Sequence, residues 1–375
     1  MYTRMIHQQV MRWMDDREVI IIKGARQTGK TTLLQQLFER DDNALILNCE
    51  NPGVASILES FDFEAIRLLF GRHRIIALDE VQSIGSIGSL LKLVFDELPD
   101  YKLIITGSSS FELMDQVGEP LTGRNIKFTM YPLSLEEMKD TKGWLPVVNS
   151  LSSYLAFGTY PGVIDLEPAK REQKLVELAG DYLFKDILMY HQIKSPVLVR
   201  QLLKALAHQA GAEVSVNELS KLLGASRHII ETYLDILEKS YVIFSLSSFS
   251  KNIRNEIRKG RKYYFYDNGI LNAVVGNLNP LQNRSDQGLL WENFCMSERL
   301  KFNMYHRTGV DMHFWRTYDQ AEIDLVEVHP DEMVAFEFIW HERRLPRLPA
   351  SFAESYPVKK LEVITPRNMQ RLFEG

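Results

Sequence analysis

The sequence predicts an α/β fold for the first 145 residues, with a parallel sheet at its centre. Short runs that are wholly or almost wholly apolar, such as 75–78 and 103–106, indicate strands that are buried on both faces, as in a parallel sheet covered by helices. A similar run at 19–23 is followed by leucines at helical spacing over 31–39. Strands that alternate with helices favour a doubly wound α/β domain.

The rest of the chain divides into further parts. Apolar residues at helical spacing, with few strand signals, predict a helical region after the first domain. A helix, a turn at Gly224, a second helix capped by Ser226 and a strand then follow one another, which is the spacing of a winged helix. A polar linker precedes a small α/β domain at the end. The predicted domains are 1–145, 146–210, 211–278 and 285–375.

Composition limits the class of protein. A hydrophobic fraction of 45% supplies real cores and excludes a disordered chain. Two cysteines, Cys49 and Cys295, are too few to staple a secreted scaffold, so we expect a reducing, cytoplasmic location. The apolar runs are too short to cross a bilayer, and we expect no membrane partner. A net charge of −5 argues against a general nucleic-acid coat but not against a local basic patch.

A glycine-rich loop lies between the predicted strand and helix at the start of the chain. Residues 24–31 spell GARQTGKT, the pattern G-x-x-x-x-G-K-[ST] of a phosphate-binding loop. Its glycines allow backbone N–H groups to face phosphates, and the helix N-terminus adds its dipole. We expect Lys30 to contact the β- and γ-phosphates of ATP, and Thr31 to ligate Mg²⁺. The predicted nucleotide-binding residues are Gly24, Ala25, Arg26, Gln27, Thr28, Gly29, Lys30, Thr31 and Thr32.

Two carboxylates directly follow the apolar run 75–78, at the strand end where ligands bind in open α/β sheets. We expect Asp79 to hold the Mg²⁺ shell. Glu80 is expected to orient or deprotonate the attacking water as a general base. An ordinary Asp-Glu turn is the alternative, and the nearby phosphate-binding loop makes it the weaker one.

Three further polar residues are candidates for the same site. Thr106 and Ser108, where the run 103–106 ends, could sense the γ-phosphate or position water, and a serine-rich helix cap is an equally weighted alternative. Arg124 could stabilise transition-state charge on the nucleotide of a neighbouring subunit in a homo-oligomer. An ordinary surface arginine is the competing interpretation.

Short strings along the chain resemble a large prokaryotic family of AAA-type ATPases. GARQTGKT, IIALDEVQ, ITGSSSF, LTGR and YPLS resemble its ATPase domain. FGTYPG at 157–162, YLFKDI at 182–187 and YFYDNGI at 264–270 resemble its C-terminal region, which has no assigned function. The resemblance implies an AAA+ fold of the P-loop NTPase class, a winged helix and a terminal domain similar to PD-(D/E)xK nucleases.

The predicted winged helix leaves DNA binding open. Acidic residues accompany the basic ones on its second helix, 226–239, and would repel phosphates in a major groove. The wing, 251–262, holds six basic residues and one acid, which suits contacts to a nucleic-acid backbone. A DNA-binding wing and a winged helix used only for protein contacts have about equal weight, so DNA and a protein partner are both candidates.

The terminal domain carries the acidic half of a nuclease pattern. Glu292, Asp324 and Glu337 match the carboxylates that such nucleases use to hold Mg²⁺. The lysine expected two residues after the last acid is replaced by Ile339, which carries no charge. We therefore favour a degenerate, nuclease-like binding domain over an active nuclease.

These features predict an ATP-hydrolysing protein whose nucleotide state moves its helical and winged-helix parts. A nucleotide-gated switch that binds DNA or protein, with slow turnover, is the first alternative. An ATPase-regulated nuclease is the second, and Ile339 counts against it.

Overall fold

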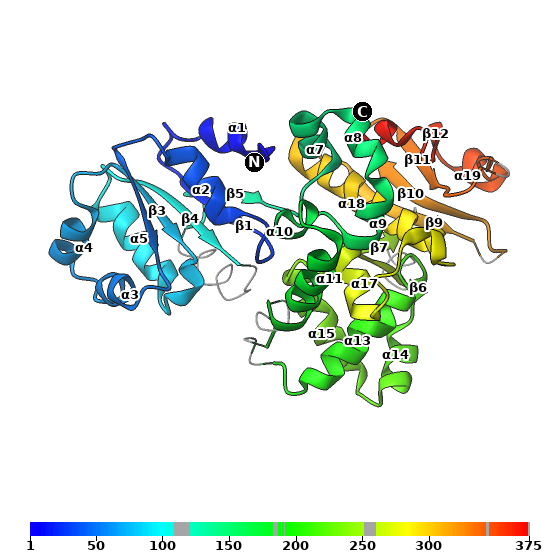
Figure 1. Cartoon of the computed structure of the whole chain (residues 1–375), viewed down its shortest axis with the longest axis horizontal. Helices are drawn as coiled ribbons and strands as arrows, with labels where there is room; N and C mark the ends of the chain where they lie inside the picture. Colours follow the sequence, from blue (N-terminus) through cyan, green and yellow to red (C-terminus); the bar gives the residue numbers. More distant parts are fainter. Residues whose placement is uncertain are drawn as a thin grey trace.

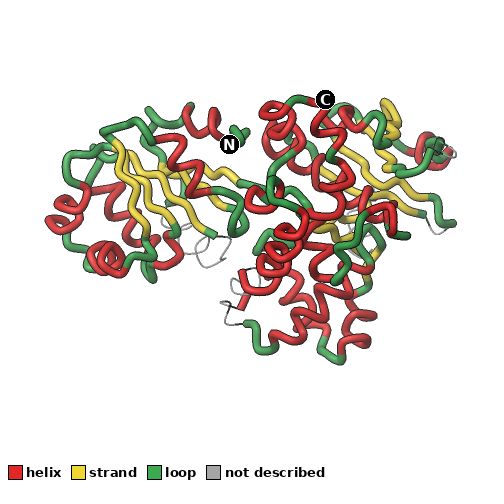
Figure 2. Tube along the Cα trace, viewed as in Figure 1, coloured by secondary structure: helices red, strands yellow, loops and turns green. Residues whose placement is uncertain are grey.

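The computed structural model describes residues 1–108, 121–182, 187–188, 190, 192–250, 260–317, 319–342 and 345–373. These residues form two lobes that lie side by side, a smaller one from the N-terminal part of the chain and a larger one from the rest (Figure 1). In each lobe, helices pack on a sheet, as Figure 2 shows.

Parallel strands form the sheet of the first lobe, in the order β2-β3-β4-β1-β5. They are β1 (Val19–Lys23), β2 (Ala44–Asn48), β3 (Ile75–Asp79), β4 (Lys102–Gly107) and β5 (Asn125–Thr129). Neighbouring residues of β1 contribute to different cores, Ile21 to one and Ile20 to the other, because side chains alternate between the faces of a sheet. The central strands β1, β3 and β4 are buried on both faces, which confirms the predicted α/β fold with a parallel sheet.

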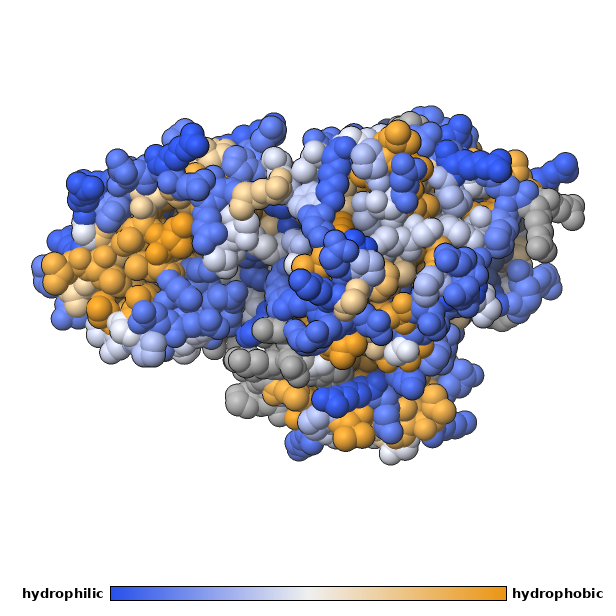
Figure 3. Space-filling view, in the orientation of Figure 1, coloured by the Kyte–Doolittle hydropathy of each residue, from blue (hydrophilic) through white to orange (hydrophobic). Residues whose placement is uncertain are grey.

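The helices that cover the sheet are α1 (Ile6–Met11), α2 (Lys30–Phe38), α3 (Pro52–Glu59), α4 (Phe63–Phe70), η1 (Val81–Ser83) and α5 (Ile87–Glu97). All of them except α1, which precedes β1, lie between the strands of the sheet in the sequence. Since β3, β4 and β1 are neighbours and parallel, their carboxyl ends meet at one edge of the sheet. The face of the molecule in Figure 3 is mostly hydrophilic, with an apolar region at the outer end of this lobe.

A helical region and a helix-turn-helix follow in the second lobe. The first helix, α7, begins with a capping box between Ser134 and Glu137. Gly224 adopts φ 63° between α14 and α15, and the Ser226 side chain caps α15, as the sequence predicts. The helical elements are α7 (Leu135–Lys142), α8 (Trp144–Asn149), α9 (Leu151–Phe157), α10 (Pro161–Ile164), α11 (Pro168–Glu177), η2 (Leu178–Tyr182), α13 (Pro196–His208), α14 (Val216–Leu223) and α15 (Arg227–Lys239).

One mixed sheet runs through the second lobe, in the order β12-β11-β10-β9-β7-β8-β6. Its strands are β6 (Glu213–Val214), β7 (Ile243–Ser248), β8 (Arg261–Phe265), β9 (Asp311–Arg316), β10 (Glu322–Val328), β11 (Met333–Phe338) and β12 (Val358–Ile364). The parallel pair β7 and β9 joins the segment predicted to be a winged helix to the terminal segment. These two parts of the sequence therefore share a sheet.

The remaining helices of this lobe are α17 (Asn268–Val275), η3 (Leu281–Asn283), α18 (Gln287–His306), α19 (Ala350–Ser355) and η4 (Met369–Phe373). The long helix α18 contributes Trp291 and Phe294 to the large core of the lobe, together with Phe336 of β11. Hence the core also crosses the predicted domain boundary between residues 278 and 285.

Two of the strings that carry the family resemblance pack against each other. The Asp267 carboxylate accepts a hydrogen bond from the Thr159 backbone N–H at 2.6 Å. A side chain at Gly158 would overlap this carboxylate, and one at Gly269 would overlap the backbone of Phe157. The segments FGTYPG and YFYDNGI are therefore closely packed against each other, and their glycines allow this close approach. Most of YLFKDI lies outside the described residues.

Candidate nucleotide-binding site

The glycine-rich loop leaves the carboxyl end of β1 and enters α2, as its pattern predicts. Gly24 has φ 154° and lies so close to the Met130 carbonyl that a Cβ would overlap its oxygen. Gly29 has φ 97° and caps α2. Both glycines are therefore required by the path of the backbone. Thr32 lies within the first turn of α2.

The side chain of Lys30 turns into this loop and is buried. Its ammonium donates hydrogen bonds to the carbonyl oxygens of Gly24 at 3.0 Å and of Ala25 at 2.9 Å. The Thr28 hydroxyl donates to the same Ala25 carbonyl at 2.9 Å. A phosphate is a stronger partner for an ammonium than these neutral oxygens. The lysine is thus held where an anion entering the loop would meet it.

Behind the loop, two hydroxyls converge on the buried carboxylate of Asp79. Thr31 donates to Asp79 Oδ2 at 2.6 Å, and the Thr106 hydroxyl donates to Oδ1. These residues stand at the adjoining ends of β1, β3 and β4, so the sheet itself brings them together. Hydroxyl and carboxylate oxygens are ligands that Mg²⁺ prefers, so the donor set of Thr31 and Asp79 fits this cation.

Glu80 begins the turn after β3 with a left-handed backbone, φ 54°. Its backbone N–H donates to Thr106 Oγ1 at 3.2 Å, and its carboxylate accepts from Gln82 Nε2 at 2.5 Å. A left-handed conformation costs a residue other than glycine about 1–3 kcal/mol, so the surrounding bonds hold it there. Hydrogen bonds to Thr106 and Gln82 therefore fix the direction of the Glu80 side chain.

Gln82 is a site residue to which the sequence assigned no role, although it belongs to the string IIALDEVQ. Besides binding Glu80, its side-chain oxygen accepts from the Ser108 backbone N–H at 3.2 Å. The Ser108 hydroxyl is buried and has no hydrogen-bond partner among the described residues, which do not include 109–120. A buried hydroxyl without a partner fits a position that a phosphate oxygen or a water would satisfy.

Comparison with known proteins bears on the fold of the two lobes. Residues 16–139 match a family model described as an AAA domain. The first lobe is thus similar to an AAA domain and has the fold of a P-loop ATPase domain. Residues 148–281 and 287–373 match two domains of unknown function, DUF8612 and DUF4143. The family models therefore name the fold of the first lobe and leave the activity of the second open.

Two relatives that match much of the chain are described as uncharacterised proteins. An uncharacterised protein of Haemophilus influenzae is 25% identical over 357 residues, covering 88% of this chain and 85% of that protein. One from Methanocaldococcus jannaschii is 25% identical over 269 residues, covering 66% of this chain and 60% of that protein. Among solved structures, the Walker-type ATPase PABY2304 of Pyrococcus abyssi covers 72% of this chain and 94% of its own, at a TM-score of 0.50 and 16% identity. That likeness concerns the fold.

Arg124 lies at the opposite end of the parallel strands of the first lobe from the glycine-rich loop 24–31, here called the P-loop. Its carbonyl accepts from the Val19 N–H at 2.9 Å, where β1 begins, whereas the P-loop follows the end of this strand, about 16 Å away. The guanidinium pairs with Asp96 at 2.8 Å and lies over the ring of Phe95. The structure does not bring Arg124 to the nucleotide site of its own chain, and a role on a neighbouring subunit stays a prediction.

The three acids predicted in the terminal domain interact electrostatically. Burial, together with the charge of Asp324, raises the pKa of Glu292 to about 8. Burial and the charges of Asp324 and Glu292 raise the pKa of Glu337 to about 8 as well. Glu292 also accepts a hydrogen bond from the Tyr264 hydroxyl at 2.9 Å. The chain thus places three carboxylates near one another from α18, β10 and β11.

Lys262 is the residue that sequence reasoning placed wrongly. The sequence assigns it to an exposed basic wing, but it lies on β8 with 1% of its surface exposed. Its ammonium pairs with Glu322 and lies 3.8 Å from Glu292 Oε1. Burial lowers the pKa of Lys262, but the charges of Glu292, Glu322 and Asp324 outweigh it and raise this pKa overall. A positive charge therefore reaches the acids from another strand, although Ile339 carries none.

The arrangement of these carboxylates is that of an ion-pair cluster. Among the residues that the structure describes, no three His, Cys, Asp or Glu side chains are placed to share a metal ion. Lys262 sits between Glu292 and Glu322, and Asp324 accepts from the Phe338 N–H at 2.9 Å. The preference for a degenerate nuclease-like domain stays a prediction.

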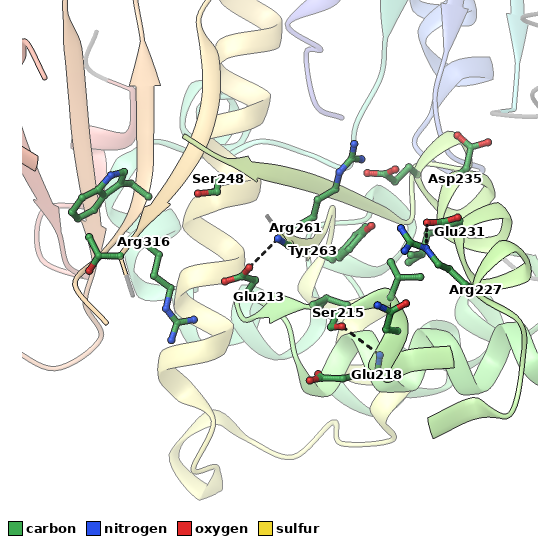
Figure 4. A pocket seen from close by; sticks show the side chains of 18 of the residues that line it. Glu213, Ser215, Glu218, Arg227, Glu231, Asp235, Ser248, Arg261, Tyr263 and Arg316 are labelled. Atoms are coloured by element: carbon green, nitrogen blue, oxygen red, sulfur yellow. Dashed lines mark hydrogen bonds and ion pairs between the residues drawn. The ribbon is translucent and has the colours of Figure 1, made fainter. Parts of the chain in front are cut away.

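The second helix of the helix-turn-helix, α15, lines a cleft of about 1150 Å³ (Figure 4). Arg227 is paired with Glu231 at 2.8 Å, and Lys239 with Asp235 at 2.6 Å. These basic side chains are therefore compensated on their own helix, which weakens the case for phosphate contacts. Across the cleft stand Arg261 and other residues of the mixed sheet.

The predicted wing itself lies mostly outside the described residues, which resume at 260. DNA binding through 251–262 stays a prediction. Lys262 is excluded from it because its side chain is buried. In the described part of the chain, no helix combines the length and apolar character needed to cross a membrane.

Proposed function

We propose that this protein binds ATP with Mg²⁺, hydrolyses the nucleotide, and couples its nucleotide state to the second lobe. The observation that carries the proposal is the convergence of Thr106 and of Thr31, which follows Lys30 in the loop, on the buried Asp79. A carboxylate with two hydroxyls at the end of a P-loop is an arrangement suited to a phosphate-bound divalent cation.

Each residue then has one task. Lys30 exchanges its carbonyl partners for phosphate oxygens, and the loop N–H groups contribute further donors. Thr31 and Asp79 would hold the cation, which neutralises charge on the phosphates when bound. Glu80, steadied by Gln82, orients the attacking water and accepts its proton. Thr106 connects Asp79 to the backbone of Glu80, so the cation site and the water site are positioned together.

Two substitutions test this assignment, with exposed Lys92 on α5 as the matched control. Lys30→Ala should lose nucleotide binding and turnover. Glu80→Gln should keep binding and lose turnover by about 10²–10⁴-fold, because only the proton acceptor is removed. Lys92→Ala should behave as wild type. Phosphate release and the binding of a fluorescent ATP analogue are the measurements, and hydrolysis retained in Lys30→Ala would refute the site.

A nucleotide-gated switch is the second candidate, supported by the cleft beside α15, whose basic residues are already paired. It predicts turnover on the order of 10⁻³ s⁻¹, like the intrinsic rate of a small GTPase, with strong ATP-dependent binding of a partner. Co-purification with Glu80→Gln distinguishes the candidates. Nucleic acid in that preparation would support the predicted wing, and a protein alone would support a role in protein contacts.

A further inference from the structure

Arg4 precedes α1 and lies outside the span that matches the AAA family model. Its side chain is 5% exposed, although arginine is rarely buried without dedicated partners. The guanidinium donates to the Thr28 carbonyl at 2.5 Å, to the Tyr131 carbonyl at 2.6 Å and to Glu137 Oε1 at 2.9 Å. One planar group therefore binds the P-loop and the segment that leads into the second lobe.

The contact to Thr28 acts on the phosphate-binding backbone. In a trans peptide the carbonyl and the following N–H point in opposite directions. Since Arg4 holds the Thr28 carbonyl, it also fixes the direction of the Gly29 N–H, on the side away from the guanidinium. Gly29 has no side chain to restrict its φ of 97°, so an external contact of this kind is needed to keep the peptide in place.

On its other side, Arg4 meets helix α18 of the second lobe. The Tyr305 hydroxyl is 3.4 Å from Arg4 Nη2 and accepts from the Tyr131 backbone N–H at 3.2 Å. The Tyr305 carbonyl accepts from Gln9 of α1 at 2.6 Å. The end of α18 is therefore bound to the N-terminal segment and to the same residue, Tyr131, that Arg4 holds.

Glu137 completes the cluster as the counter-ion of Arg4. Its buried carboxylate accepts from Arg4, from the Met5 backbone N–H at 2.9 Å and from the Ser134 backbone N–H at 2.9 Å. Burial lowers the pKa of Arg4, but the charge of Glu137 outweighs it and raises this pKa overall, so Arg4 stays charged. The N–H donors of a guanidinium share one rigid plane. When Glu137 holds this plane, a displacement of the Thr28 carbonyl is therefore transmitted to the Tyr131 carbonyl.

We propose that Arg4 is a positioning residue that couples nucleotide occupancy of the P-loop to the docking of α18. The proposal rests on the nucleotide binding proposed above. A phosphate that orders the Gly29 N–H stabilises the Thr28–Arg4 contact, and through Tyr131 and Tyr305 it stabilises the junction with the second lobe. Coupling is reciprocal, so loosening Tyr305 weakens nucleotide binding.

The test uses the full chain in three variants. Arg4→Lys keeps the charge and removes the planar fork, Tyr305→Phe removes one hydroxyl and keeps the ring, and Arg12→Ala on the exposed end of α1 is the control. Nucleotide affinity is measured with a fluorescent ATP analogue. Hydrogen exchange of the P-loop and of α18 is followed with and without ATP, after thermal melting has verified that each variant folds.

In wild type and Arg12→Ala, ATP should slow exchange in both the P-loop and α18. In Arg4→Lys and Tyr305→Phe, the P-loop should still respond to ATP, α18 should not, and affinity should fall about fivefold or more. An α18 response in Tyr305→Phe and Arg4→Lys equal to that of wild type overturns the coupling role while ATP binding stands. A wild-type P-loop that does not respond to ATP overturns both the proposed function and this inference.

Discussion

Replacing the buried Lys262 by methionine should destabilise the second lobe because it leaves carboxylates without their counter-ion. Methionine has a similar length and no charge, so packing changes little and the loss is mainly electrostatic. Breaking a buried ion pair by removing one partner costs about 3–5 kcal/mol. Since the Glu322 side chain is 31% exposed, water screens part of its interaction with Lys262. We therefore expect Lys262→Met to lower the free energy of unfolding by about 3 kcal/mol at pH 9.

The cost should depend on pH because Glu292 titrates within the accessible range. Its pKa is about 8 in the folded protein, above the ordinary value of 4.5, so the folded state holds a proton that the unfolded chain releases. Stability from this proton is fully present below pH 4.5 and is lost as pH rises through 8. In Lys262→Met the carboxylates have no cation to offset their ionisation, so the penalty should be smaller at pH 6 than at pH 9.

Urea unfolding followed by circular dichroism at the two pH values measures this. The exposed Lys359, paired with Glu332, provides a control, since a surface pair contributes about 0–1 kcal/mol. The double variant Lys262→Met with Glu292→Gln should recover part of the loss at pH 9. A cost for Lys262→Met no larger than that of Lys359→Met at both pH values would refute the burial of Lys262 among carboxylates.

The remaining predictions concern the two lobes separately. Gly24→Ala should lower the melting temperature and abolish turnover, because its methyl group would overlap the Met130 carbonyl; an unchanged melting curve contradicts this. Glu292→Gln alone should flatten the decline of stability between about pH 4.5 and 8, as seen in melts across that range; a decline as steep as in wild type would exclude Glu292 as its source. Asp324→Ala should leave nuclease assays at background, like wild type, and a Mg²⁺-dependent activity that this change removes would reverse the interpretation of the terminal domain.

Local patterns account for most of what the sequence predicts correctly in the first lobe. The apolar runs, the glycine spacing and the pair Asp79 and Glu80 are each read within one strand or one turn. Because parallel strands present their carboxyl ends at one edge, local patterns are enough to bring Lys30, Thr31 and Asp79 into one neighbourhood. Gln82 was within the same string, but only its hydrogen bonds to Glu80 and Ser108 give it a role.

The remaining features depend on pairing between strands that are far apart in the sequence, which no local pattern predicts. Arg124 belongs to a string of the family, yet the start of β5 puts it at the opposite end of the parallel strands from the P-loop. The winged-helix and terminal segments have separate patterns, but pairing between β7 and β9 makes their strands one sheet. The order of strands in a sheet depends on how the connections between strands cross it, and the hydrophobic periodicity of a single segment does not determine this.

The sequence by itself determined the α/β fold of the first lobe and the residue types of its phosphate-binding loop, because backbone conformation and strand burial are imposed by neighbouring residues. Only the tertiary structure decided the environments of the buried charges. Arg4 pairs with Glu137, which is 133 residues away in the sequence. Lys262 belongs to a basic segment of the sequence but lies among acidic side chains in the fold. A charge far along the chain becomes buried only where the fold delivers its counter-ion, since an unpaired ion would be expelled to water.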